Sequence, residues 1–297
     1  MTRNVRDTQY VPSGDGEIAF QVLGSGALDI LVVNESVLPI EALHDNVNTA
    51  AYLSRLSAWG RVVVFDRRGV GLSDPVSAFT PIALDDWVAD AVAVLDAVAS
   101  ERAAVFSSGP SAGLIAMLLA SRFPERVSFL SLYDAIARYR WARDYPWGVT
   151  PEFEQELDDR LRSGWGTAHL PDRRGRFAAM AAHHPQIVEW AVKWFRRGAS
   201  RSTMTAQQQV LRTSDVRGAL SGITCPTLVT NHDDVEDGRF LTDRCVTADS
   251  RRGDASPRIA RESVTSARAV SERGRRRGRA TMPGRPVRRR QRRSWRG

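Results

Sequence analysis

The sequence predicts an α/β protein with a mostly parallel sheet and helices on both faces of that sheet. Short apolar runs typical of buried strands alternate with segments whose apolar residues recur at helical spacing. A Gly-x-Ser-x-Gly turn at residues 109–113 lies between one such run and an apolar helix. Residues 135–214 contain no clear strand, which predicts a helical lid over the carboxyl end of the sheet.

The first half of the chain supplies most of the expected sheet. Residues 17–23 alternate imperfectly between polar and apolar and precede Gly-Ser-Gly, which favours an antiparallel strand at a sheet edge. Short apolar runs are typical of strands covered by helices on both faces. These runs are residues 29–33, 61–65, 103–107 and 127–132. Apolar residues at helical spacing predict helices over residues 48–59, 84–98 and 111–122.

The second half predicts helices first and a return to the sheet afterwards. Helical patterns cover residues 151–162, 177–183 and 187–195, and a short helix and a strand are expected at 215–220 and 226–230. We therefore expect a core in two parts, residues 1–134 and 215–244, which flank the lid at 135–214. Residues 245–297 form a separate tail.

The positive charge of the chain is confined to this tail. The whole chain carries a formal net charge of +8, yet residues 245–297 contain 17 arginines and 4 acidic residues, a net charge of +13. The tail has no Leu, Phe or Tyr, so it cannot bury enough apolar surface to offset the entropy of ordering, and disorder is expected. The arginines could contact nucleic acid through phosphates. Because the remaining chain is mildly acidic, we rank that interpretation low.

Other compositional features set limits on the class of protein. Two cysteines do not form a disulfide framework, and 42% hydrophobic residues suffice for a sizeable core. The N-terminal residues lack the apolar run of a signal peptide, and no run approaches the length that spans a bilayer. We expect a cytoplasmic protein without a membrane partner, cofactor or metal. The sequence gives no indication of the oligomeric state.

The Gly-x-Ser-x-Gly turn carries the chemistry. A serine on a tight turn between a strand and a helix presents its hydroxyl for attack, an arrangement called a nucleophile elbow. Ser111 has this position, and Pro110 before it removes one backbone donor. A second glycine-containing loop, residues 66–74, follows the preceding strand and lacks the Lys-Ser/Thr of a P-loop. We interpret it as a structural loop at the same face.

These motifs together resemble the α/β-hydrolase superfamily. The resemblance rests on Asp66-x-Arg68-Gly-x-Gly-x-Ser, on the elbow, and on the Phe-Pro-Glu-Arg at residues 123–126. Residues 8–10, 18–22 and 144–149 resemble, more narrowly, the α/β-hydrolase domain that precedes class III nucleotide cyclase domains in actinobacterial proteins. The resemblance covers about residues 8–244, and no cyclase segment is visible.

The resemblance implies roles for individual residues. Ser111 matches the nucleophile, and the backbone N–H groups of Ala112 and Ser36 match the oxyanion donors. The family usually has a glycine before the second donor, whereas this chain has Glu35, and a carboxylate there opposes a developing oxyanion. Asp234 matches the triad acid, and Asp134 is an alternative acid at the end of the preceding strand.

The histidine base of such a triad is absent from its expected place. The resemblance puts it beyond the acid in the chain, but no histidine follows His232. Earlier histidines occur at positions 44, 169, 183 and 184, where surface or packing roles are expected.

Our hypothesis is that a frameshift or truncation near residues 244–246 replaced the last strand, the histidine loop and the final helix. His232 has no partner ligands at zinc spacing.

Two functions follow from these patterns. The first is a serine esterase-like hydrolase that acts on a small acyl substrate, with weak or absent turnover because the histidine is lacking. The alternative is a non-catalytic ligand-sensing or regulatory domain that kept the pocket and lost the chemistry. Glu35, Pro110 and the absent histidine favour the alternative.

Overall fold

The computed structural model describes residues 7–35, 37–76, 81–146, 148–167, 181–182 and 184–230. The chain divides into two compact units, residues 1–260 and 261–297. All described residues belong to the first unit, and the fold below is the fold of that unit. Ser36, Asp234 and the predicted tail lie outside the described residues.

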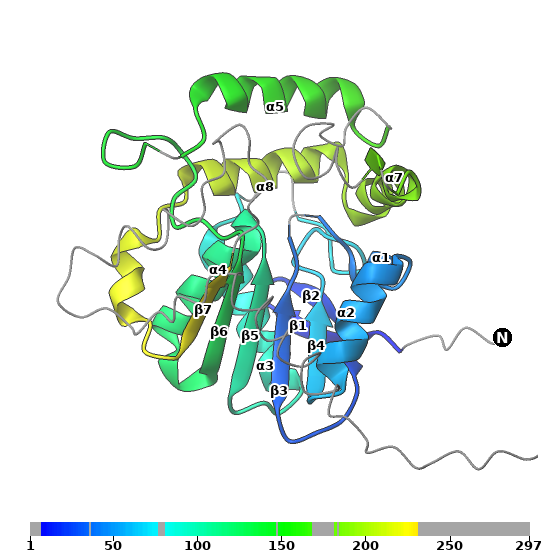
Figure 1. The fold of residues 1–297 in the computed structure, drawn as a ribbon, viewed down its shortest axis with the longest axis vertical. Coiled ribbons are helices and arrows are strands. Elements are labelled where there is room, and N and C mark those ends of the chain that lie inside the picture. The colour runs from blue at the N-terminus through cyan, green and yellow to red at the C-terminus, as the bar shows by residue number, and fades with distance from the viewer. Residues whose placement is uncertain are drawn as a thin grey trace, which may run out of the picture. The chain divides into compact units, whose positions relative to one another are not determined.

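A mostly parallel sheet forms the centre of the fold (Figure 1). The described strands are β1 (Gln9–Ser13), β2 (Gly16–Leu23), β3 (Asp29–Val33), β4 (Arg61–Phe65), β5 (Ala103–Ser108), β6 (Val127–Tyr133) and β7 (Thr227–Thr230). Their order in the sheet is β1-β2-β4-β3-β5-β6-β7. The five strands from β4 to β7 in this order pair in parallel, while β1 and β2 are antiparallel. The predicted parallel sheet is therefore confirmed.

The expected edge strand is not at the edge. β2 pairs on one side with β4 and on the other with β1, which is the outermost strand. The hairpin between β1 and β2 turns at Gly14, whose φ of +63° lies in the left-handed region that favours glycine. β1 contains Pro12, which lacks an N–H and is tolerated in an edge strand.

Helices cover both faces of the sheet. α3 (Leu84–Ala97) and α4 (Pro110–Arg122) share a core cluster with Leu31 and Val63. α1 (Ile40–Leu43) and α2 (Val47–Ser57) share the opposite cluster with Ile30 and Val62. Successive side chains of a strand point to opposite faces, so β3 and β4 supply both cores. This arrangement explains why their sequences are almost wholly apolar.

Three long helices lie within the segment that was predicted to contain no strand. They are α5 (Pro151–Gly164), α7 (Gln186–Gly198) and α8 (Arg201–Thr213), and η2 (Arg217–Gly222) is a 3₁₀ helix near the expected short one. The helices predicted at 151–162 and 187–195 are confirmed, and the one at 177–183 is described only at residues 181–182, which are helical. α8 was not predicted. The division into core and lid stays a prediction.

The helices of this segment contact the loops that follow the parallel strands. Val37 after β3 and Val70 after β4 form one buried cluster with Leu161 of α5 and Met204 of α8. Figure 1 shows α5 above α8, with both helices beyond the ends of the strands. At the end of α7, the Gly198 carbonyl accepts a 2.7 Å hydrogen bond from the Gly71 N–H. The loops after β3 and β4 are thus packed beneath these helices.

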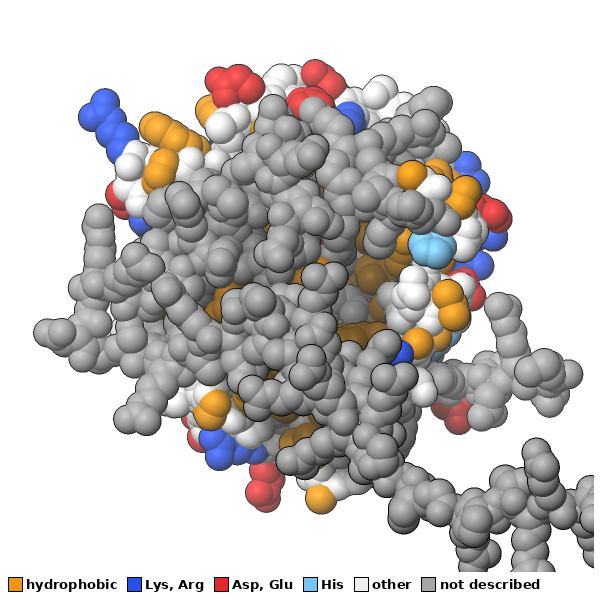
Figure 2. Space-filling model, viewed as in Figure 1, with side chains coloured by type: hydrophobic (Ala, Val, Ile, Leu, Met, Phe, Trp, Pro, Cys, Tyr) orange, Lys and Arg blue, Asp and Glu red, His pale blue; other side chains and the backbone are white. Residues whose placement is uncertain are grey.

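The surface of the described part carries charges of both signs. Acidic and basic side chains both appear at the rim of the face in Figure 2. Ion pairs on this surface include Arg126–Asp96 at 2.7 Å and Arg122–Asp85 at 2.7 Å. Among the helices of the described residues, none has the length and apolarity needed to cross a membrane.

Candidate active site

The predicted elbow is present as a strand, a tight turn and a helix. β5 ends at Ser108, and α4 begins at Pro110 after Gly109, whose φ is +92°. A side chain is strained in that conformation, so glycine suits the turn. Pro110 occupies the first position of the helix, where an N–H has no partner within the helix, so the missing donor costs little. Ser111 follows in the first turn.

A carboxylate lies against this turn. Glu35 Oε2 accepts hydrogen bonds from the backbone N–H of Ser111 at 3.0 Å and from that of Ala112 at 3.3 Å. The Ser111 side chain also lowers the pKa of the Glu35 carboxyl, as a nearby hydrogen-bonding group does. Ser111 is 1% exposed. The side chain of Glu35 therefore occupies the start of α4, where a helix favours a negative charge.

Glu35 and the buried Arg67 interact electrostatically beside the elbow. Burial raises the pKa of the Glu35 carboxyl, while the nearby Arg67 cation and the N–H groups of the elbow oppose that rise. Burial lowers the pKa of Arg67 to about 10, so its guanidinium remains charged at neutral pH. It lies 4.4 Å from the centroid of the Trp87 ring, and its Nη2 donates to Gln207 Oε1 at 3.5 Å. Arg67 thus supplies a positive potential at the site.

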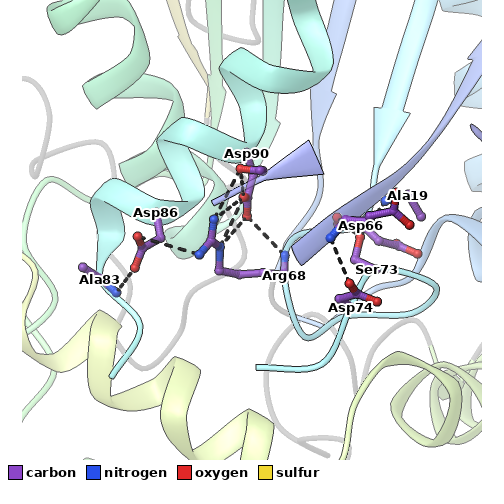
Figure 3. Close-up of polar contacts among 10 residues, drawn as sticks. Ala19, Asp66, Arg68, Ser73, Asp74, Ala83, Asp86 and Asp90 are labelled. Carbon is purple, nitrogen blue, oxygen red and sulfur yellow. Dashed lines mark hydrogen bonds and ion pairs between the residues drawn. The ribbon is translucent and has the colours of Figure 1, made fainter. Parts of the chain in front are cut away.

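The loop after β4 is held by its own aspartate. Asp66 Oδ1 accepts from the Ile40 N–H at 2.7 Å, and Oδ2 accepts from the Leu72 N–H at 3.0 Å. Ser73 Oγ donates to the Asp66 carbonyl at 2.6 Å and accepts from the Ala19 N–H at 2.8 Å (Figure 3). These bonds join the loops after β3 and β4 and support the structural interpretation of residues 66–74.

A second group of polar contacts ties the same loop to α3. Arg68 Nη2 donates to Asp90 Oδ1 at 2.7 Å, and the Arg68 backbone N–H donates to Asp90 Oδ2 at 3.2 Å (Figure 3). Ser13 Oγ also donates to Asp90 Oδ1, at 2.8 Å. Asp90 is fully buried, and Asp86 lies farther from Arg68, at 3.8 Å. Asp90 therefore connects β1, α3 and the loop.

We expect the protonation of Asp66 to make stability depend on pH. Burial raises the pKa of Asp66 to about 7, whereas an unfolded aspartate titrates near 4. The folded state then holds the proton to higher pH, so the free energy of unfolding falls as pH rises through this window, by about 2.5 kcal/mol between pH 5 and 7.5. Denaturant unfolding at both pH values measures the fall.

The matched variant for this prediction is Asp66→Asn, which cannot titrate. Its free energy of unfolding is expected to change less than that of the unsubstituted protein between the same two pH values. Other titrating groups contribute equally to both proteins, so the difference between them isolates Asp66. An identical pH dependence in the two proteins would refute the assignment.

The remaining predicted site residues are only partly described. Asp134 directly follows β6 and has a φ of +52°, and its N–H donates to the Thr230 carbonyl at 3.0 Å. Asp234 and Ser36 lie outside the described residues, as do His169, His183 and His232. The predicted tail disorder and the missing last strand and helix concern residues that are likewise outside. These assignments, the roles of Ser111 and Ala112 and the cytoplasmic location stay predictions.

The described histidines have contacts of their own. His44, which directly follows α1, has its Nε2 3.0 Å from Oε1 of Gln21 in β2. His184 is exposed and precedes α7. No group of three or more His, Cys, Asp or Glu that could hold a metal occurs within the described residues.

Two residues of the site, Arg67 and Gln207, were not predicted from the sequence. Arg67 occupies the variable position of the Asp66-x-Arg68 motif, so the motif says nothing about its side chain. Gln207 lies on α8, which carried no clear apolar period.

Comparisons with known proteins extend these observations. No family model matches the chain. The chain is 31% identical over 178 residues to the candidate carbamate hydrolase RutD of Variovorax paradoxus (strain S110), a match that covers 59% of this chain. It spans 63% of that relative's length.

Solved structures match over more of the chain. The enol-lactonase of Burkholderia xenovorans LB400 superposes with a TM-score of 0.66 at 19% identity, covering 90% of this chain and 98% of its own. An esterase of Thermogutta terrifontis superposes with a TM-score of 0.63 at 17% identity, and the match covers 91% of this chain and 98% of the esterase. The bromoperoxidase of Bacillus anthracis superposes with a TM-score of 0.65 at 15% identity, and the match covers 86% of this chain and 90% of the bromoperoxidase. All three have the fold described above.

Proposed function

We propose that this protein, which has the α/β-hydrolase fold, is a serine esterase-like hydrolase that acts on a small acyl substrate. The observation that carries the proposal is the placement of Ser111 in the first turn of α4, directly after the glycine turn that ends β5. A serine in that position can attack an acyl carbonyl and form an acyl-enzyme, which water then releases. The ester or lactone bond is the bond that breaks.

The neighbouring groups receive roles under the same proposal. The Ala112 N–H stabilises the oxyanion, together with the N–H of Ser36, and Asp234 is the acid, with Asp134 as the alternative acid. Since the sequence has no histidine beyond His232, the proton of the serine hydroxyl lacks the usual acceptor. We therefore propose slow turnover, supported by the large losses that follow removal of one triad member.

The names of the similar proteins support carbonyl chemistry. One is named as a carbamate hydrolase, another as an enol-lactonase and a third as an esterase. Carbamates, lactones and esters all present a carbonyl carbon that a nucleophile can attack. This common feature supports the acyl class of the substrate.

A second candidate function has its own observation. Glu35 accepts hydrogen bonds from the N–H groups of Ser111 and Ala112, and the Ala112 N–H is the group proposed to stabilise an acyl oxyanion. A domain that kept its pocket to sense a ligand, without turnover, tolerates such a contact. This alternative includes the regulatory domain suggested by the resemblance to cyclase-associated proteins.

Covalent labelling tests the hydrolase proposal. The full chain is incubated with a fluorophosphonate, and the mass of the protein and of its peptides is measured. We expect one phosphonyl group on Ser111, slow hydrolysis of a small ester above background, and the loss of both in Ser111→Ala. Ser121→Ala is the matched control, because Ser121 lies on the same helix and its hydroxyl donates to the Ala219 carbonyl. Labelling that persists in Ser111→Ala would reject Ser111 as the nucleophile.

A further inference from the structure

We propose that the Glu35 carboxylate is an internal occupant of the oxyanion site, so that Ser111 reacts with an acyl group only when Glu35 has left the start of α4. The inference rests on the proposed function, because it concerns the same serine. It assigns to Glu35 an inhibitory contact that the chain makes with its own site.

Glu35 binds the backbone N–H that the reaction would need as an oxyanion donor. The N–H of the residue after the nucleophile is an oxyanion donor in this fold. Here the Ala112 N–H points to Glu35 Oε2 at 3.3 Å, and the Ser111 N–H points to the same oxygen at 3.0 Å. An acyl oxygen that approaches this donor meets a carboxylate oxygen already bound to it. The two oxygens would compete for the same N–H and the same space, so only one of them can occupy the Ala112 donor at a time.

Several features hold the carboxylate in this place. The start of α4 favours a negative charge, and the Arg67 cation adds to the attraction. Gly109 leaves the necessary space, because a Cβ built on it would lie 2.4 Å from Glu35 Oε2. Any other residue at position 109 would therefore collide with the carboxylate. Glu35 can take this position only because residue 109 has no side chain.

The nucleophile is buried beside the same side chain. Ser111 is 1% exposed, and its backbone N–H donates to Glu35 Oε2 at 3.0 Å. A buried hydroxyl is poorly accessible to an electrophile. Departure of Glu35 from the start of α4 would therefore change both the oxyanion donor and the surroundings of the serine.

The opposite role for Glu35 makes the opposite prediction. If its carboxylate were the base that accepts the Ser111 proton, its removal would slow every reaction of the serine. If Glu35 occupies the oxyanion site, its removal frees the Ala112 N–H and speeds the reactions of Ser111. Variants of Glu35 therefore decide between the two roles by the sign of the effect.

The experiment compares Glu35→Ala and Glu35→Gln with the unsubstituted full chain. The second-order rate constant for fluorophosphonate labelling of Ser111 is measured by mass spectrometry. Because one oxyanion donor contributes roughly 10²-fold or more to such reactions, we expect at least a 10-fold rise in Glu35→Ala. Glu35→Gln keeps the length and loses the charge, so a smaller rise is expected, and this variant serves if Glu35→Ala does not fold. Glu41→Gln, on exposed Glu41 of α1, removes one charge nearby and should label at the unsubstituted rate.

Amide hydrogen exchange at Ser111 and Ala112 gives a readout that does not depend on reactivity. Exchange at these two amides is expected to be about 10-fold faster or more in Glu35→Ala than in Glu41→Gln, since the hydrogen bonds are lost. Unchanged exchange, or labelling that is equal or slower in Glu35→Ala, overturns the occupant proposal alone. If no variant labels at Ser111, the proposed function fails, and the occupant proposal fails with it.

Discussion

Replacing Asp90 by alanine is expected to lower the free energy of unfolding by about 3–5 kcal/mol. Asp90 is fully buried and accepts hydrogen bonds from the Arg68 guanidinium at 2.7 Å, the Arg68 N–H at 3.2 Å and the Ser13 hydroxyl at 2.8 Å. Its removal leaves a largely buried guanidinium with Asp86 at 3.8 Å as a weak substitute. The loss of one partner of a buried pair costs more than the pair itself contributes.

Chemical denaturation of the full chain measures this loss, with Asp96→Ala as the matched control. Asp96 is also an α3 aspartate paired with an arginine at 2.7 Å, but its side chain is 61% exposed. An exposed pair contributes about 0–1 kcal/mol, so the control is expected to stay within that range. Asp90→Asn serves if the alanine variant does not fold. Equal losses in Asp90→Ala and Asp96→Ala would contradict the argument from burial.

Gly71→Ala is expected to destabilise the protein by about 3 kcal/mol or more. Gly71 has a φ of +55°, and a Cβ built on it would lie 2.1 Å from Asp66 Oδ2. The left-handed conformation costs a side chain roughly 1–2 kcal/mol. The collision also forces Asp66 away from the N–H groups that it binds, and a buried polar group left without its hydrogen bond costs about 1–3 kcal/mol.

Gly218→Ala is the control for this prediction. Gly218 lies in η2, its φ is not in the left-handed region, and a Cβ on it has no atom within 4 Å among the described residues. Its substitution is expected to change the free energy of unfolding by less than about 0.5 kcal/mol, as at other surface sites. Thermal and denaturant unfolding of both variants provide the comparison. A similar stability of Gly71→Ala and Gly218→Ala would show that the loop adapts to a side chain.

The strands covered on both faces were predictable because burial on two sides selects continuous apolar runs. β3 and β4 are such runs, and the structure places them at the centre of the sheet. β1 was not predicted, since an edge strand tolerates Pro12 and exposed residues and so loses the pattern. α8 was missed for a different reason. It buries Gln207 and Gln208 alongside Met204, so its inner face has no apolar period.

The candidate site was predictable to the extent that it is local in sequence. The turn, the helix start and the position of Ser111 lie within a few residues of one another. The sequence also identified Glu35 as a departure from the family pattern. Its bonds to Ser111 and Ala112 join residues 76 and 77 positions apart, and such a contact depends on how β3 and β5 pair. Arg67 escaped notice because a charged side chain is rarely found fully buried.

Gly198 links the end of α7 to the loop that carries Glu35 without any intervening side chain. A Cβ on Gly198 would lie 1.8 Å from the Val37 carbonyl oxygen, and the Gly198 carbonyl itself binds the Gly71 N–H. Rotamer changes normally absorb small shifts between packed helices, but a junction of three backbones has no rotamers. The end of α7 therefore has no side chain whose rearrangement could widen its contact with Val37 and Gly71. Any residue larger than glycine at position 198 would have to push these backbones apart.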